Sequence, residues 1–148
     1  MGGFETLEEI RKKIESFRFV VLYHTLPVDS HRQSHWDLLL ETHSTKPNSL
    51  LCFEANIPPD QWKTQTWVNQ LPNHRPIYLN YEGPISNNRG HVQRVLQGTL
   101  NWICFGGARL EFTFEAILLD GSIPMSGSIL LQTDESHSQR WKMAAKIE

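Results

Sequence analysis

Hydrophobic and polar positions alternate with a period of two residues along much of the chain, as expected of half-buried β-strands. The clearest stretch is 109–118, where Leu110, Phe112 and Phe114 lie two residues apart and polar residues fill the positions between them. Seven other ranges are rich in β-branched and aromatic residues or alternate in the same way. We predict strands there: 18–24, 34–42, 49–55, 76–82, 92–100, 101–105 and 122–132.

Three segments depart from this period. Residues 5–17 predict an N-terminal helix, because Thr6 and Glu9 form a capping box and apolar residues follow at helical spacing. Residues 58–69 predict a short helical excursion, and 139–146 fit either a last strand or a short helix.

Short strands joined by turns, with Asp120-Gly121 as a strong hairpin signal, predict a mainly β fold. The predicted architecture is a small antiparallel β-barrel carrying the N-terminal helix as an extension. No internal repeat or linker divides the sequence, so 1–148 is predicted to be a single domain.

Composition and charge narrow the classes of partner. Of the 148 residues 39% are hydrophobic, enough to fill a core, and 14 basic against 16 acidic residues give a net charge of −2. A protein that coats duplex DNA usually carries a strong basic excess. Any contact with nucleic acid is therefore expected to be local, at an end or at one phosphate.

No apolar run is long enough to cross a bilayer, and no signal-peptide core follows Met1. The sequence thus predicts a cytoplasmic protein without a membrane partner. Cys52 and Cys104 lie in apolar stretches and are expected to be reduced, and the absence of a CxxC pair excludes a zinc ribbon.

A first candidate site lies in His35-Trp36-Asp37 on a predicted strand. Residues i and i+2 of a strand point to the same side, so His35 and Asp37 emerge together. His24, at the end of the preceding strand, brings a second imidazole if the two strands pair, and His31 in the connecting loop is the rival. Two imidazoles and a carboxylate suit Mn, Fe, Co or Zn and leave coordination positions open.

A second candidate site lies in 74–83. His74 stands just before a predicted strand and Tyr78 within it, which supplies a phosphate binder or general acid and a phenolic donor. Glu82 is a candidate to orient one of these groups. The loop 86–90 that follows is rich in hydrogen-bond donors and suits contact with an anion.

These motifs together resemble the 3′-phosphoesterase domain of bacterial DNA ligase D. That family shows a strand ending in a histidine, then H-Y-D-F-R-L-E, then H-P-L-D-Y-x-x-F-E-G. This chain has a strand ending in His24, then H-W-D-L-L-L-E at 35–41 and H-R-P-I-Y-L-N-Y-E-G at 74–83. The resemblance covers residues 17–105, and Gly98-Thr99 also fits it.

The resemblance implies a small β-barrel whose cavity binds manganese or another divalent transition metal. His24, His35 and Asp37 would be the metal ligands, and His74 and Tyr78 would contact the phosphate. The family removes a ribonucleoside or a phosphate from 3′ ends of nucleic acid during DNA end repair. A DNA ligase or polymerase would then have to act in trans.

Two departures from the family pattern lie at phosphate-binding positions: Leu39 and Gln70 replace basic residues. Leucine cannot form the bidentate contact that arginine makes with phosphate. Arg75, Arg89 and Arg94 are the candidates to replace these groups from another direction.

The departures keep two other hypotheses open. One is a binding module for nucleic-acid ends or a repair partner that has lost turnover. The other is a cupin-like small-molecule metalloenzyme, in which Glu41 and His91 would join His35 and Asp37 as ligands.

Overall fold

A computed structural model describes residues 6–7, 16–134 and 138–148. Within these ranges there are nine strands and two short 3₁₀ helices. The strands are β1 (Phe17–Thr25), β2 (His35–Leu40), β3 (Leu50–Ala55), β4 (Thr66–His74), β5 (Gly83–Pro84), β6 (His91–Phe105), β7 (Arg109–Leu118), β8 (Ile123–Gln132) and β9 (Arg140–Ile147). The 3₁₀ helices are η1 (Pro59–Gln61) and η2 (Pro76–Leu79).

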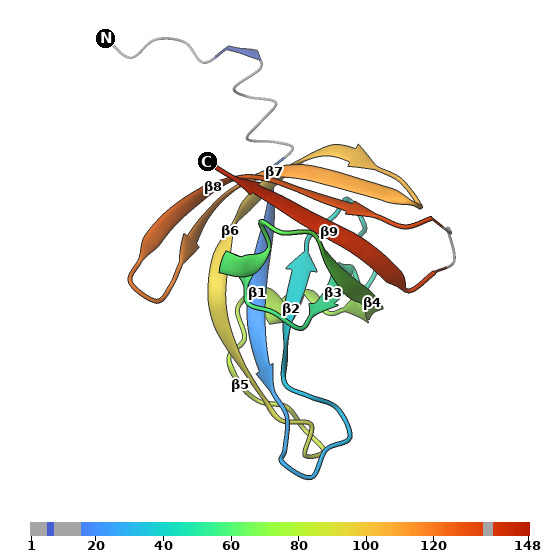
Figure 1. Cartoon of the computed structure of the whole chain (residues 1–148), viewed down its shortest axis with the longest axis vertical. Helices are drawn as coiled ribbons and strands as arrows, with labels where there is room; N and C mark the ends of the chain where they lie inside the picture. The colour runs from blue at the N-terminus through green and yellow to red at the C-terminus, as the bar shows by residue number, and fades with distance from the viewer. Residues whose placement is uncertain (1–5, 8–15, 135–137) are drawn as a thin grey trace.

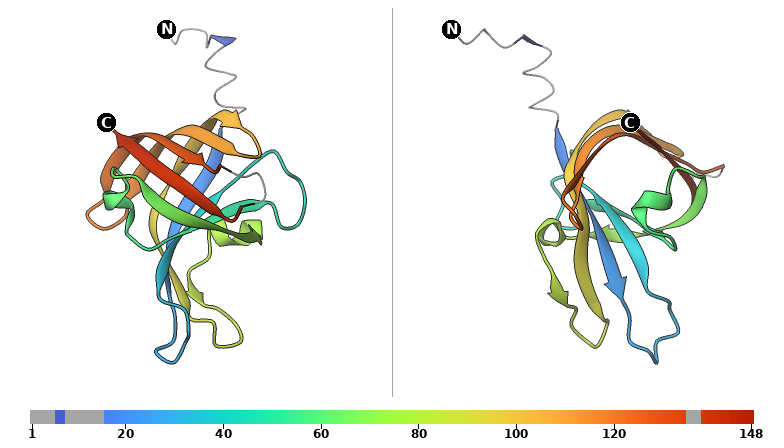
Figure 2. Two further views of the ribbon diagram at one scale, coloured as in Figure 1. Left: turned by 45° about the vertical axis from the view of Figure 1, so that its right-hand side comes forward. Right: turned by 60° about the vertical axis from the view of Figure 1, so that its left-hand side comes forward.

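All described strands belong to one antiparallel sheet, with the order β1-β2-β3-β4-β9-β8-β7-β6-β5 (Figure 1). An additional pairing of β1 with β6 joins the sheet to itself, so that eight strands form a ring and β5 lies outside it on β6. The β1–β2 and β5–β6 connections extend from the same end of the molecule (Figure 2). Each of the eight ring strands therefore has one face inside the ring and one face outside.

The alternation of side chains separates two apolar clusters. The larger cluster takes alternate residues from eight strands, among them Phe19, Leu38 and Phe112, and fills the inside of the ring. The smaller cluster takes the opposite faces of β1, β2 and β3 and is covered by η2. Its buried members are Val20, Leu22, Leu39, Leu50, Cys52, Leu79 and Val92. The outer face of β1–β3 is thus a second packed layer, not a solvated surface.

The mainly β, antiparallel prediction is confirmed, and strands lie over the predicted ranges 18–24, 34–42, 49–55, 109–118 and 122–132. Residues 139–146 are a strand, and the two ranges predicted at 92–105 form one long strand, β6. Most of the helix predicted at 5–17 lies outside the described residues, and its last residue, Phe17, already belongs to β1. Cys52 and Cys104 are both free.

The strand predicted at 76–82 is wrong. Pro76 begins η2 instead, because proline has a fixed φ and no N–H for a strand ladder. His74 therefore ends β4, and Tyr78 lies on a 3₁₀ turn, not within a strand. The helical prediction for 58–69 holds only at η1, since Thr66 already begins β4.

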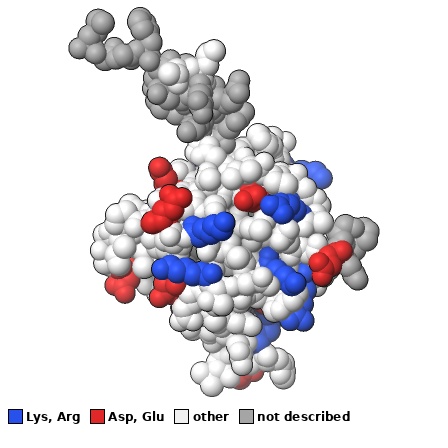
Figure 3. Space-filling model, turned by 45° about the horizontal axis from the view of Figure 1, so that its top comes forward, with Lys and Arg blue, Asp and Glu red and all other residues white. Residues whose placement is uncertain are grey.

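No helix within the described ranges is long and apolar enough to cross a membrane. On the face drawn in Figure 3, Lys and Arg side chains stand in small groups with Asp and Glu groups between them. Neither the positive nor the negative side chains therefore form one continuous patch on this face.

Candidate metal centre

Pairing of β1 with β2 brings the first candidate residues together. His24 lies directly opposite His35 in the register, and Leu22 lies opposite Asp37. Because positions two apart on a strand share a face, His24, His35 and Asp37 all project from the outer face of the two strands. The structure thus selects His24 over His31, which stays in the exposed β1–β2 connection.

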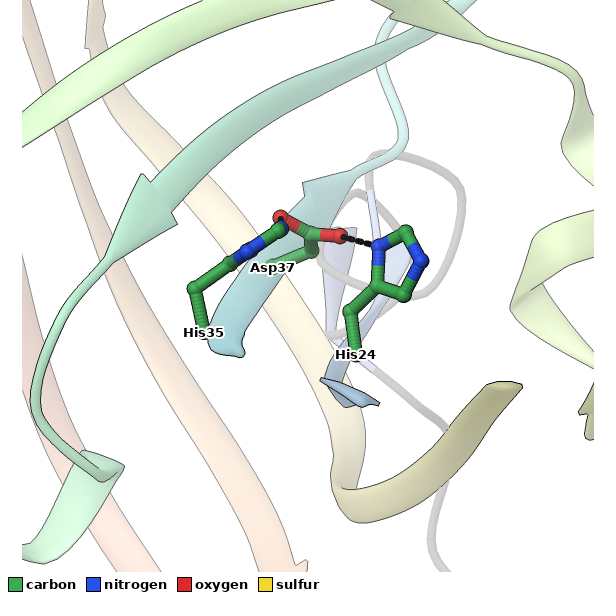
Figure 4. A group of neighbouring side chains, drawn as sticks. All are labelled: His24, His35 and Asp37. Atoms are coloured by element: carbon green, nitrogen blue, oxygen red, sulfur yellow. Dashed lines mark ion pairs between the residues drawn. The ribbon is translucent and has the colours of Figure 1, made fainter. Parts of the chain in front are cut away.

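The carboxylate of Asp37 lies between the two imidazole rings (Figure 4). Its Oδ2 is 3.5 Å from Nδ1 of His24, and its Oδ1 is 3.1 Å from Nε2 of His35. One ligand atom from each residue lies within 4.8 Å of the other two. His35 and Asp37 are buried and His24 is partly buried, so the group is largely shielded from water.

In both His24 and His35, the ring nitrogen that faces away from Asp37 identifies the tautomer. Nδ1 of His35 is 3.0 Å from the carbonyl oxygen of Gln33, and Nε2 of His24 is 2.7 Å from that of Arg89. A carbonyl only accepts, so each of these nitrogens carries the hydrogen. The nitrogens that face Asp37 are then lone-pair nitrogens unless a proton or a cation stands there. Metal-binding histidines are commonly oriented in this way.

Two further observations fit a cation between these groups. Oδ1 of Asp37 is buried and has no hydrogen bond of acceptable geometry to any described residue, despite its short distance to His35. A buried carboxylate oxygen without a partner is costly, and a bound cation would satisfy it. Two neutral imidazoles and one carboxylate are also the donor set expected for a divalent transition metal with open positions.

Without a cation, Asp37 and His35 shift each other's pKa. Burial alone would lower the pKa of the His35 imidazole. The Asp37 carboxylate 3.1 Å away, the Gln33 carbonyl and the charge of Glu54 outweigh burial and raise that pKa. Burial would raise the pKa of the Asp37 carboxyl, but the two imidazoles hold it below its usual value. In the metal-free site the protonated form of His35 and the ionised form of Asp37 therefore stabilise each other.

Glu54 was not among the predicted site residues. It lies opposite Asp37 in the β2–β3 register, and its Oε2 is 3.4 Å from Nε2 of His35. The same oxygen accepts a hydrogen bond from Arg32 in the β1–β2 connection. Glu54 thus adds a second carboxylate beside the His35 ring, and Arg32 holds it there.

The triad opens on a pocket of about 570 Å³. His74 and Tyr78 from the second candidate site line the same pocket, with their rings 5.7 Å apart. Nδ1 of His74 lies 2.9 Å from the carbonyl oxygen of Pro72, which leaves Nε2 as the basic nitrogen. The structure therefore brings His24, His35, Asp37, His74 and Tyr78 to one pocket.

Three arginines also line this pocket: Arg32, Arg75 and Arg89. Arg89 is bonded through its guanidinium to the backbone carbonyl and side chain of Ser86, and Arg75 lies over the ring of Tyr78. Asp37 is the one carboxylate among the described lining residues. Arginines therefore outnumber carboxylates on the pocket wall, which suits an anionic ligand.

Other predicted residues lie elsewhere. Glu82 accepts a hydrogen bond from the backbone N–H of Arg94 and lies 3.6 Å from its guanidinium, and neither residue lines the pocket. Glu41 lies just after the end of β2, four residues from Asp37, and accepts a hydrogen bond from the backbone N–H of Arg18. His91 is exposed at the start of β6 and does not line the pocket. The structure does not bring the cupin-like ligand set together.

The two positions that depart from the family pattern have structural partners. Leu39 is fully buried in the outer apolar cluster, two residues along β2 from Asp37. Gln70 points inside the ring, where its Oε1 accepts a hydrogen bond from Nε1 of Trp141, 3.2 Å away. Neither side chain lines the pocket.

The site also differs from the arrangement that the resemblance implies. The triad lies on the outer face of the ring, whereas apolar side chains fill the inside. The reason is that side chains alternate between the two faces of a strand. Phe19, Val21 and Leu38 point inward, so the positions between them, and the site residues in step with those positions, point outward.

Comparison of the sequence with models of known protein families finds no match, and comparison with curated proteins finds none either.

Proposed function

We propose that the protein is a metal-dependent phosphoesterase that acts on 3′ ends of nucleic acid and removes a terminal phosphate or ribonucleoside. The observation that carries the proposal is the orientation of two imidazoles. Each gives its N–H to a backbone carbonyl and turns its other nitrogen toward Asp37, at the wall of an arginine-lined pocket.

His24, His35 and Asp37 would hold Mn²⁺ or another divalent transition metal, and Glu54 would add negative charge beside them. A metal bound there would polarise a phosphoryl oxygen and lower the pKa of a bound water. The donor set supports a divalent ion and does not by itself distinguish Mn²⁺ from Fe²⁺, Co²⁺ or Zn²⁺.

The remaining pocket residues have roles that follow from their chemistry. Arg75 and Arg89 would bind the phosphate oxygens and offset the charge that develops during transfer. His74, protonated at Nε2, would give its proton to the leaving oxygen, and the phenol of Tyr78 would donate a hydrogen bond to the phosphoryl group.

A 3′ end suits this pocket because the basic groups are few and local. With a net charge of −2, the chain lacks the basic excess of a duplex-coating protein. A terminal phosphate needs only a few cationic groups at one point. A DNA ligase or polymerase would use the cleaned end.

The test compares release of phosphate from a 3′-phosphorylated oligonucleotide by the wild type and by Asp37→Asn. We expect strict dependence on a divalent metal and a loss of about a hundredfold or more in rate, because the amide cannot supply the negative charge of the site. Asp60→Asn is the matched control, since Asp60 is exposed on η1 away from the pocket. Equal rates for the wild type and Asp37→Asn would reject the proposal.

A second candidate, a binding module without turnover, is favoured by Leu39 and Gln70. Both stand where the resembled family has basic residues, and both are used in packing. Tight, Asp37-dependent binding of the 3′-phosphorylated oligonucleotide without product, under Mn²⁺, Zn²⁺, Co²⁺ and Fe²⁺, would support this candidate over the enzyme.

A further inference from the structure

A stacked aromatic and basic group lies on the outer face of β4 and β9. The guanidinium of Arg140 lies 4.1 Å from the ring centre of Trp67, and the ammonium of Lys142 lies 5.2 Å from it. Trp67 is opposite Lys142 in the β4–β9 register, so the three side chains share one face. We call this group of Trp67, Arg140 and Lys142 the Trp67 platform.

The Trp67 platform is accessible to a ligand. The Trp67 side chain is 44% exposed, an unusual state for a large aromatic residue, and Arg140 is also exposed. Within the described part of the chain, neither Arg140 nor Lys142 forms an ion pair with a carboxylate. Among the described residues, both cations contact the Trp67 ring instead of a carboxylate.

A continuous row of cross-strand neighbours connects the platform to the metal centre. Asp37 is opposite Glu54, Glu54 is opposite Asn69, and Asn69 is opposite Arg140. Directly opposed residues project from the same face, so all four lie on the outer face of the ring. Three strand spacings of roughly 4.8 Å put the platform about 14 Å from Asp37.

The chemistry along this row matches a nucleic-acid strand. Arg32 is paired with Glu54 part of the way along the row, and Arg140 and Lys142 lie at its end. Single-strand binding sites combine cationic side chains for phosphates with aromatic rings on which bases stack. A distance of about 14 Å corresponds to roughly four nucleotides at the 3.4 Å rise of one strand of a duplex.

We propose that the single strand leading to the 3′ end crosses the outer face of β3, β4 and β9 and stacks a base on the Trp67 platform. The inference rests on the proposed function for the identity of the pocket occupant. It adds to that function a preference for ends that carry several unpaired nucleotides. Charge complementarity and the indole ring favour this occupant over an acidic polypeptide, which offers carboxylates but no bases.

The test measures binding of a fluorescent oligothymidylate of about 12 nucleotides with a free 3′-hydroxyl, by fluorescence anisotropy. Trp67→Leu should weaken binding about tenfold, because it removes one stacking contact. Arg140→Gln and Lys142→Gln should each reduce the slope of log affinity against log salt by about 0.7. Trp67→Phe should restore most of the affinity.

The controls change the same residue types away from the row. Phe105→Leu removes an exposed aromatic side chain from β6, and Arg109→Gln removes an exposed guanidinium from β7. Both should leave the affinity within about twofold. An abasic oligomer of the same length should bind equally well to the wild type and to Trp67→Leu, because it has no base to stack.

Hydrolysis separates this inference from the proposed function. A 3′-phosphorylated dinucleotide is too short to reach the platform, so Trp67→Leu should leave its turnover unchanged and raise KM only for the longer substrate. Oligonucleotide binding that depends on Trp67, without any phosphate release, would support the platform and reject the phosphoesterase. Equal oligonucleotide affinity for the wild type and Trp67→Leu, or equally tight binding of polyglutamate, would overturn the platform.

Discussion

Glu54 belongs to the site, although none of the sequence motifs includes it. Its carboxylate lies between the guanidinium of Arg32 and the ring of His35. In Glu54→Gln the negative charge is lost while the positive charge of Arg32 remains beside the centre. We expect the affinity for Mn²⁺, measured by calorimetry, to fall about 10- to 100-fold.

The control for this prediction is Glu115→Gln, which removes an exposed carboxylate from β7. Unchanged Mn²⁺ affinity in Glu54→Gln would show that the carboxylate serves only as a partner for Arg32. Weaker binding in both variants would instead indicate a general effect of surface charge.

His35 and Asp37 could be predicted because their spacing on one strand fixes their common side. His24 needed only one further assumption, that β1 and β2 form a hairpin. Glu54 could not be found in this way, because the β2–β3 register depends on packing between segments separated by nine residues of connection, 41–49. Arg32, in a loop, gives no periodic signal at all.

At the scale of elements, β6 and β7 approach each other closely at Gly98. A Cβ at this position would lie 2.1 Å from the carbonyl oxygen of Glu115 and 2.7 Å from Cα of Ala116. Both are backbone atoms, so the two strands would have to move apart. We expect Gly98→Ala to lower the free energy of unfolding by about 1–3 kcal/mol, measured by urea denaturation.

Gly107→Ala is the matched control, since a Cβ there meets nothing within 4 Å. Its free energy of unfolding should stay close to that of the wild type. A Gly98→Ala variant as stable as the wild type would mean that β6 and β7 are farther apart than described.

The elements with strict alternation were predictable, and those that break it were not. β7 keeps a two-residue period throughout, with Leu110, Phe112 and Phe114 buried. β4 buries only Val68 and contains Pro72, so its sequence gave no strand pattern. β4 forms because its backbone pairs with β3 on one side and with β9 on the other. This pairing depends on the assembled sheet and not on the local sequence.

For the whole molecule, the metal-free site predicts a stability maximum in weakly acidic solution. The depressed pKa of Asp37 adds stability above the ordinary value of 3.8, which is lost as the pH falls through the folded-state pKa. The raised pKa of His35 adds stability that is complete below 6.5 and is lost as the pH rises through its folded-state pKa. The free energy of unfolding should therefore be greatest between these limits.

Urea denaturation over a pH series checks this prediction. Above the pH of maximum stability, the free energy of unfolding should fall by no more than about 1.4 kcal/mol per pH unit, which is the slope for one proton. His35→Gln should remove that loss, whereas His91→Gln, at an exposed position, should retain it. Saturating Mn²⁺ should also abolish it, because the cation replaces the proton. If the free energy of unfolding of His35→Gln falls at alkaline pH as much as that of the wild type, His35 is not the group responsible.

The hydrogen bonds that orient His24 and His35 end on main-chain oxygens, those of Arg89 and Gln33. Every amino acid supplies such an oxygen, so the orientation of the two rings does not depend on which side chains stand at positions 33 and 89. Only the paths of the two connections must be preserved. Descendants of one ancestral protein can then share these two oriented rings although their residues at 33 and 89 differ, and a search for such relatives should follow loop shape and the three ligands.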